Sequence, residues 1–156
     1  MKFAGPLVVV TDIRKARTFY ESVLGQTVKY DFGENIQFES GISLQTKSSF
    51  AAMVGVGEDA VTLCSHNGEL YFETKDFDAT AARLNGIPGI RYRQKLMEHP
   101  WGQRVSRLYD PDGNLIEIGE TMQTVARRYL KMGWTVEKAA EKTQLPLEQV
   151  AALWDV

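Results

Sequence analysis

Apolar residues recur along the chain with two periodicities, one typical of strands and the other of helices. The short β-branched run Leu7–Val10 predicts a buried strand. Behind Asp12, apolar residues recur at three- and four-residue spacing up to Gly25, which indicates an amphipathic helix with an N-cap and a glycine stop. Three short runs rich in β-formers follow: Thr27–Phe32, Ile36–Glu39 and Ile42–Gln45. The predicted order is β-α-β-β-β.

The same order returns in the second half of the chain. The segment Lys47–Gly68 reads as a crossover, in which Ala60–Cys64 is a candidate strand. Leu70–Thr74 then predicts a strand, and Asp76 caps a short helix that ends at Asn85-Gly86. Three strands complete the stretch: Ile90–Gln94, Gln103–Tyr109 and Leu115–Ile118. We expect an internal repeat, because each such unit needs its twin to complete a core.

The last two of these strands are joined by the turn Asp110–Asn114, in which Pro111 and Gly113 supply the backbone angles of a hairpin. The strand after the turn holds a carboxylate, Glu117, between two isoleucines. Because side chains alternate along a strand, we expect Glu117 to face away from those isoleucines, toward solvent or a cavity. An ungapped overlay of the two module ends aligns Glu117 with Gln45.

Two motifs in the repeat resemble a known family. Val8–Gly25 resembles its first module. Trp101-Gly102, followed by Tyr109–Glu117, resembles the end of its second module. The family is that of the glyoxalase/bleomycin-resistance/dioxygenase proteins, also called the vicinal-oxygen-chelate superfamily. The resemblance implies an α+β fold in which two βαβββ modules, residues 4–46 and 68–119, form a curled mixed sheet around a cavity. It implies no single activity, because this fold hosts lyases, dioxygenases, isomerases, thiol transferases and drug-sequestering binders.

The resemblance also implies four metal-ligand positions, one on the first and one on the last strand of each module. Here they hold Gly5, Gln45, Glu69 and Glu117, so that two of the four are strong ligands. The two carboxylates with the Gln45 carbonyl would suit one divalent ion such as Mn²⁺ or Mg²⁺, whereas the two-His-one-carboxylate set of a non-haem iron dioxygenase is missing from the sequence. The alternative is two solvated strand carboxylates without a metal.

The candidate catalytic residues are Glu117, Glu69 and His99. If both carboxylates face one cavity without a metal, their mutual repulsion should raise the pKa of one of them. That carboxyl group would then be a candidate general acid or base. Pro100-Trp101 stiffens the loop of His99, which could then accept a proton at the cavity rim; an ordinary loop histidine is the alternative. Strand parity and aromatic character predict ligand-binding roles for residues that are also common core types: Leu7, Val9, Tyr71, Trp101 and Tyr109. The resemblance and the overlay with Glu117 add Gln45 to the ligand-binding residues.

Composition narrows the setting. The 156 residues are 44% hydrophobic and 24% charged, with a formal net charge of −2 and no polybasic run, which argues against nucleic acid or an anionic membrane surface as a partner. The single cysteine, Cys64, cannot form an internal disulfide and reads as buried packing rather than a nucleophile. Because no signal-like segment or run of roughly 18 apolar residues appears, we expect a cytoplasmic protein.

Beyond the repeat, residues 120–156 predict a helical appendage. Helices are expected over Thr121–Met132, from Thr135 to about Thr143, and from Pro146 onward. The order resembles a helix-turn-helix, but basic and acidic residues balance in this segment, which favours a packing or dimer-forming role over DNA binding.

The sequence thus leaves three hypotheses for function. The first is a protein, expected to be a homodimer, that binds a small molecule in the inter-module cavity with an incomplete metal-ligand set. The second is a divalent-metal-dependent lyase or isomerase of the glyoxalase type. The third is a ligand-sensing regulator that uses the C-terminal helices.

Overall fold

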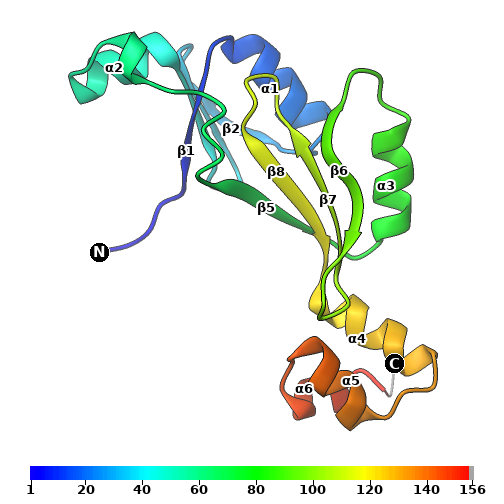
Figure 1. Ribbon diagram of the computed structural model, residues 1–156. Coiled ribbons are helices and arrows are strands. Elements are labelled where there is room, and N and C mark those ends of the chain that lie inside the picture. The colour runs from blue at the N-terminus through cyan, green and yellow to red at the C-terminus, as the bar shows by residue number, and fades with distance from the viewer. Residues whose placement is uncertain (155–156) are drawn as a thin grey trace. The chain divides into compact units, whose positions relative to one another are not determined.

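The computed structural model describes residues 1–154. It contains two four-stranded sheets, ordered β1-β4-β3-β2 and β5-β8-β7-β6 (Figure 1). The strands are β1 (Leu7–Val10), β2 (Val28–Asp31), β3 (Asn35–Phe38), β4 (Ser43–Thr46), β5 (Glu69–Thr74), β6 (Arg91–Glu98), β7 (Arg104–Tyr109) and β8 (Leu115–Glu120). The helices are α1 (Ile13–Ser22), α2 (Lys47–Val54), the 3-10 turn η1 (Glu58–Ala60), α3 (Phe77–Asn85), α4 (Met122–Lys131), α5 (Val136–Thr143) and α6 (Leu147–Ala151).

The two sheets repeat one topology, in which the first strand of the module lies beside the last. In the first sheet β1 runs parallel to β4, and β4, β3 and β2 pair antiparallel. The predicted α+β fold with two βαβββ modules is confirmed. The chain clusters into two compact units, Met1–Glu69 with Tyr109–Leu115 and Leu70–Leu108 with Ile116 onward, and each is described by itself.

The core of the first unit lies between α1 and its sheet. Asp12 caps α1 as predicted, because its carboxylate accepts hydrogen bonds from the backbone amides of Arg14 and Lys15. Tyr20 on α1 is fully buried and stacks on Phe38 of β3, with the ring centroids 5.6 Å apart. Strand parity also holds in β1, where Val8 and Val10 are buried while Leu7 is 40% exposed.

The crossover between the modules differs from the prediction. It forms the helix α2, which ends at Gly55 in the left-handed conformation, and then the turn η1. The candidate strand Ala60–Cys64 is wrong: positive φ angles at Cys64 and His66 are incompatible with extended pairing there. Cys64 is also exposed rather than buried.

The tail of the second unit is helical, as predicted. Thr121 and Thr135 cap α4 and α5 by accepting hydrogen bonds from the amides of Thr124 and Lys138. The three helices enclose a core of their own, made of Val125, Ala126, Tyr129, Leu130, Ala139, Ala140 and Val150. In Figure 1, α4 begins directly where β8 ends and α5 and α6 gather on it. No helix in residues 1–154 is both long and apolar enough to span a bilayer.

Candidate functional site

The predicted site residues divide between the two units. The first unit holds Leu7, Val9, Gln45, Glu69 and Tyr109, and the second holds Tyr71, His99, Trp101 and Glu117. The cavity between the modules stays a prediction. Within each unit, the local contacts of these side chains show what chemistry each can perform.

Gln45 is buried and its amide is engaged on both sides. Its Oε1 accepts a hydrogen bond of 2.7 Å from Asn35 Nδ2, and its Nε2 donates one of 2.6 Å to Ser49 Oγ. Val9 lies beside Gln45 as its partner in the parallel β1–β4 pair, so these two predicted residues are brought together. The Gln45 carbonyl therefore already has a strong partner inside its own sheet.

Gly5 precedes β1 in a position that excludes any side chain. Its φ is +143°, and a Cβ on this residue would lie 1.9 Å from the carbonyl oxygen of Gly41. A metal ligand at this position would require the backbone to move. The first of the four family ligand positions is thus closed by backbone packing in this chain.

Glu117 lies in the middle of β8 and is only 6% exposed. Its carboxylate forms an ion pair with the guanidinium of Arg107 on the adjacent strand β7. The flanking Ile116 and Ile118 are buried as well, so β8 is covered on both faces. The carboxylate that the sequence presents as isolated has a cationic neighbour within its own sheet.

Tyr71, on β5, is the centre of a polar cluster in the second unit. Its hydroxyl accepts a hydrogen bond of 2.8 Å from Gln103 Nε2 and donates one of 3.1 Å to Glu73 Oε1. Partial burial raises the pKa of Tyr71 to about 12; the Gln103 hydrogen bond opposes this, while Glu73 and the charge of Glu117 add to it. Tyr71 therefore stays protonated near neutral pH and can donate a hydrogen bond.

His99 and Trp101 form a rigid corner where β6 turns into β7. Their rings stack with centroids 4.2 Å apart, and Trp101 Nε1 donates to Gln103 Oε1 at 3.1 Å. The turn is closed by a hydrogen bond of 2.8 Å from the Gly102 amide to the His99 carbonyl. Gln103 thereby links two predicted ligand-binding residues, Trp101 and Tyr71. That His99 acts as a proton acceptor stays a prediction.

The remaining predicted residues, Glu69 and Tyr109, lie in the first unit. Glu69 is exposed at the start of β5. The hydroxyl of Tyr109 lies 2.9 Å from His66 Nε2, and the Cys64 thiol lies 3.9 Å from that same nitrogen. Tyr109 is therefore in contact with the crossover segment. These contacts do not define a ligand site by themselves.

The turn motif that carries the family resemblance is structural. Asp110 is buried, and its carboxylate accepts hydrogen bonds from the amides of Asp112 and Asn114 and from the Tyr20 hydroxyl. Burial raises the pKa of Asp110, while its hydrogen bonds from Asn114 and Asp112 oppose that rise. Asp112 in turn accepts from the amide and hydroxyl of Thr11. The motif ties the hairpin tip to the first module.

A divalent metal ion needs several donor side chains that converge on one point. Among residues 1–154, no three side chains of His, Cys, Asp or Glu group closely enough to hold a metal. Gly5 offers no ligand, Gln45 Oε1 is hydrogen-bonded to Asn35, and Glu117 is paired with Arg107. The residues present do not fit a preformed metal centre.

Two residues of this region were missed at the sequence level, Arg107 and Gln103. A signal for Arg107 was available, because counting outward from the Asp110–Asn114 turn places Arg107 directly opposite Glu117. The same count pairs Arg104 with Glu120, and these two side chains form an ion pair of 2.7 Å. Gln103 carries no such signal, since a polar residue at a strand start is common.

The paired βαβββ modules define a protein of the glyoxalase/bleomycin-resistance/dioxygenase fold. Residues 3–123 match the family described as glyoxalase-like domain, and the chain belongs to that family. It is similar to an uncharacterised protein, YraH, of Bacillus subtilis (strain 168), with 31% identity over 130 residues, covering 76% of this chain and 97% of that protein.

Solved structures agree with this assignment. A protein of unknown function from Agrobacterium tumefaciens str. C58 shares 34% identity with a TM-score of 0.68, covering 78% of this chain and 94% of that one. A glyoxalase-related enzyme from Fulvimarina pelagi shares the fold at 20% identity and a TM-score of 0.65, covering 77% and 88%. The family match ends at residue 123, so most of the helical tail lies outside it.

Proposed function

We propose that this glyoxalase-like protein binds a small molecule without a resident metal ion, using the polar cluster of Tyr71, Glu73 and Gln103. The observation that supports this most directly is that the polar residue on the last strand of each module, Gln45 or Glu117, already has a partner on the neighbouring strand. Gln45 is hydrogen-bonded to Asn35 and Glu117 is paired with Arg107. An ion bound at Glu117 would first have to displace the Arg107 guanidinium, and the charge of this partly buried cation would oppose the ion.

The second unit offers a ligand a defined set of groups. Tyr71 is half-exposed and supplies a protonated hydroxyl, and its neighbour Glu73 is exposed. The stacked rings of His99 and Trp101 supply a flat aromatic surface, and Gln103 links Trp101 to Tyr71 by hydrogen bonds. A few polar groups beside an aromatic surface are typical of sites that orient a small molecule.

Metal analysis separates this proposal from the glyoxalase-type lyase or isomerase. Protein purified without chelator is expected to hold far less than one equivalent of Mn, Zn, Ni or Fe by elemental analysis. A stoichiometric ion that is lost in Glu117→Gln, but kept in the matched surface variant Glu58→Gln, would contradict the proposal and favour the metal enzyme.

Ligand binding is tested on the same protein by native mass spectrometry for co-purified molecules and by a thermal-shift screen of small molecules. A molecule present at about 100 times its Kd stabilises the folded state by about 2.7 kcal/mol. Tyr71→Phe is expected to reduce that stabilisation, whereas the control Tyr92→Phe on β6 leaves it unchanged. Equal responses in both variants would remove Tyr71 from the site.

The proposal includes a cytoplasmic homodimer, which the family fold and the internal repeat favour. Size-exclusion chromatography with light scattering is expected to give twice the chain mass of 17.6 kDa. A monomer at all concentrations would remove the dimer from the proposal and leave the binding site to be tested separately.

A further inference from the structure

The helical tail carries a groove along α4. It has a volume of about 770 Å³, and its lining includes residues along α4 from the N-cap Thr121 to Lys131. Most of its lining comes from residues after 123, outside the segment that matches the family. The volume falls within the range of about 300–1,000 Å³ that is typical of small-molecule sites.

The lining of the groove is basic. It includes Lys75, Arg127, Arg128 and Lys131 and contains no carboxylate among the described residues. The acidic residues of the tail that the structure describes, such as Glu137, Glu141 and Glu148, do not line it. The balanced charge of the linear segment therefore conceals a local excess of positive charge.

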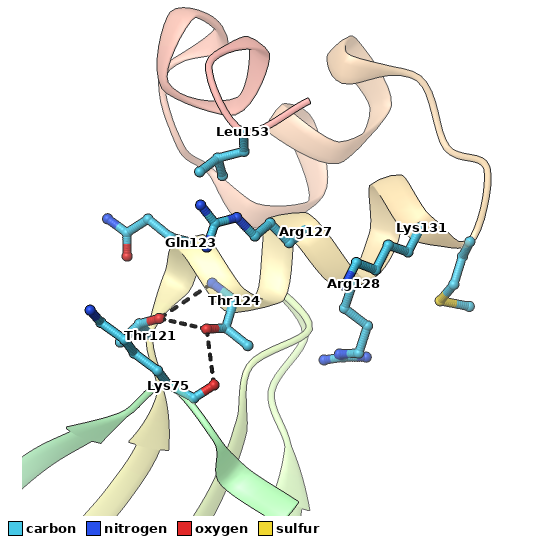
Figure 2. Close-up of a pocket in the computed structure, with 9 residues that line it drawn as sticks. Lys75, Thr121, Gln123, Thr124, Arg127, Arg128, Lys131 and Leu153 are labelled. Carbon is cyan, nitrogen blue, oxygen red and sulfur yellow. Dashed lines mark hydrogen bonds between the residues drawn. The ribbon is translucent and has the colours of Figure 1, made fainter. Parts of the chain in front are cut away.

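Three of these four cations are available to a ligand. Arg128 is committed, since its guanidinium contacts Glu120 at 3.1 Å and Glu98 at 3.7 Å and donates to the Gly102 carbonyl. Lys75, Arg127 and Lys131 form no ion pair with any carboxylate in residues 1–154, and Arg127 and Lys131 are exposed. Figure 2 shows the guanidinium of Arg127 on the side of α4 that faces Leu153, whereas that of Arg128 points away.

The rest of the lining supplies polar and apolar contacts. At the start of α4, Thr121 and Thr124 hydroxyls lie 2.8 Å apart, and Thr124 also donates to the Lys75 carbonyl (Figure 2). Leu153 forms an apolar wall. A smaller hollow of about 200 Å³ shares Arg127, Lys131 and Leu153 with the groove and adds the exposed ring of Trp154.

We propose that this groove binds a small organic anion, with a phosphate or carboxylate group held by Arg127 and Lys131 and an aromatic or other flat apolar body packed on Leu153 and Trp154. Guanidinium and ammonium groups bind both kinds of anion through charge-assisted hydrogen bonds.

A small anion fits this surface better than a nucleic acid does. Three available cations in one groove neutralise few phosphates, whereas a duplex needs a long basic face. The net charge of the chain is −2, which repels a polyanion outside the groove. Binding of DNA is therefore an alternative that the experiment must be able to reveal.

The test is an NMR titration of the full-length ¹⁵N-labelled protein at low salt with phenyl phosphate, benzoate and inorganic phosphate. We expect saturable shifts in the α4 amides and in the Trp154 indole signal, which Trp154→Phe identifies. If phenyl phosphate alone shifts these signals, the ligand class is phosphate; if benzoate does so as well, the site accepts either anion.

A pair of double variants with the same charge change isolates the groove. Arg127→Gln/Lys131→Gln removes one arginine and one lysine from the lining, and Arg14→Gln/Lys142→Gln removes one of each elsewhere. We expect about tenfold weaker phenyl phosphate binding in the first variant and unchanged binding in the second. Because all four substituted side chains lie outside the core, both variants should keep the wild-type spectrum elsewhere.

Three results would overturn the proposal. One is the absence of shifts in α4 with phenyl phosphate or benzoate up to about 10 mM, well above the roughly millimolar Kd of a weak specific site. Another is equal weakening by the two double variants, which would indicate a nonspecific charge effect. The last is tight, salt-sensitive binding of a DNA duplex that shifts the same α4 signals, which would assign the groove to nucleic acid.

Discussion

Glu120, at the end of β8, provides the sharpest test of how the helical tail is attached to the second sheet. Its side chain is fully buried, and its carboxylate contacts Arg104 at 2.7 Å and Arg128 at 3.1 Å. It also accepts a hydrogen bond of 3.0 Å from the Arg104 amide. Arg104 lies on β7 and Arg128 on α4, so one carboxylate joins the sheet to the helix.

Glu120→Gln replaces this carboxylate with a neutral amide of nearly the same size. Breaking a buried ion pair typically costs about 3–5 kcal/mol. Arg104 also pairs with Asp78, and Arg128 also lies near Glu98, which reduces the loss. We therefore expect a decrease of about 2–3 kcal/mol in the free energy of unfolding, or about 5–10 °C in Tm.

The pH dependence gives the same variant a second readout. Burial alone would raise the pKa of Glu120, but its hydrogen bonds from Arg104 and the charges of Arg128 and Arg104 outweigh burial and hold it below the ordinary value of 4.5. The ionised carboxylate therefore stabilises the fold above pH 4.5, and this contribution is lost as the pH falls through the lowered pKa. Glu120→Gln should flatten that part of the stability curve.

Urea unfolding followed by circular dichroism measures both effects. The matched control is Glu98→Gln, whose carboxylate is about half-exposed and lies 3.7 Å from Arg128. We expect less than about 0.5 kcal/mol from the control. If the two variants lose equal stability, or if the acid limb of Glu120→Gln keeps the wild-type slope, Glu120 does not join the tail to the sheet.

Two further predictions use contacts in the same unit. Gly102→Ala places a Cβ 2.3 Å from the Tyr129 hydroxyl, whereas Gly133→Ala, at nearly the same positive φ, meets no atom within 4 Å. Thermal unfolding should therefore show a loss of about 1–2 kcal/mol for Gly133→Ala and at least about 2 kcal/mol more for Gly102→Ala; equal losses would exclude the Tyr129 contact. Arg107→Gln removes the cation beside the buried Glu117 carboxylate and should cost about 2–4 kcal/mol. Added Mn²⁺ should then raise the Tm of this variant more than that of the wild type, and an equal rise would contradict the role given to Arg107.

The fold could be predicted from sequence because its signals are local and occur twice. Asp12 and Asp76 both cap helices by accepting hydrogen bonds from amides two or three residues ahead. Such contacts need no knowledge of distant parts of the chain. The helix α2 was not predicted, because its sequence lacks a clear apolar stripe and its N-cap, Thr46, makes no side-chain capping hydrogen bond.

The charge of the tail shows a different limit of sequence reasoning. A sum over residues 120–156 treats basic and acidic side chains as evenly mixed. In the structure Arg127 and Lys131, one helical turn apart on α4, line the same groove, while Arg128 turns to Glu120. Helical spacing predicts that Arg127 and Lys131 lie on the same face of α4. The partner of Arg128, in contrast, lies on β8, so the sequence of the helix alone does not predict it.

The candidate site reveals a further regularity of the repeat. The overlay that aligns Gln45 with Glu117 also aligns Asn35 with Arg107. Asn35 and Gln45 are cross-strand neighbours on β3 and β4, joined by a hydrogen bond of 2.7 Å, and Arg107 and Glu117 are joined across β7 and β8. Each module therefore provides its terminal-strand polar residue with a partner from the preceding strand, neutral in one module and ionic in the other. The double variant Arg107→Gln/Glu117→Gln replaces the ionic pair of the second module by a neutral pair like that of the first. In a double-mutant cycle, we expect a coupling of about 1–3 kcal/mol in the free energy of unfolding between the two substitutions. Additive effects would mean that the two positions do not act as a pair.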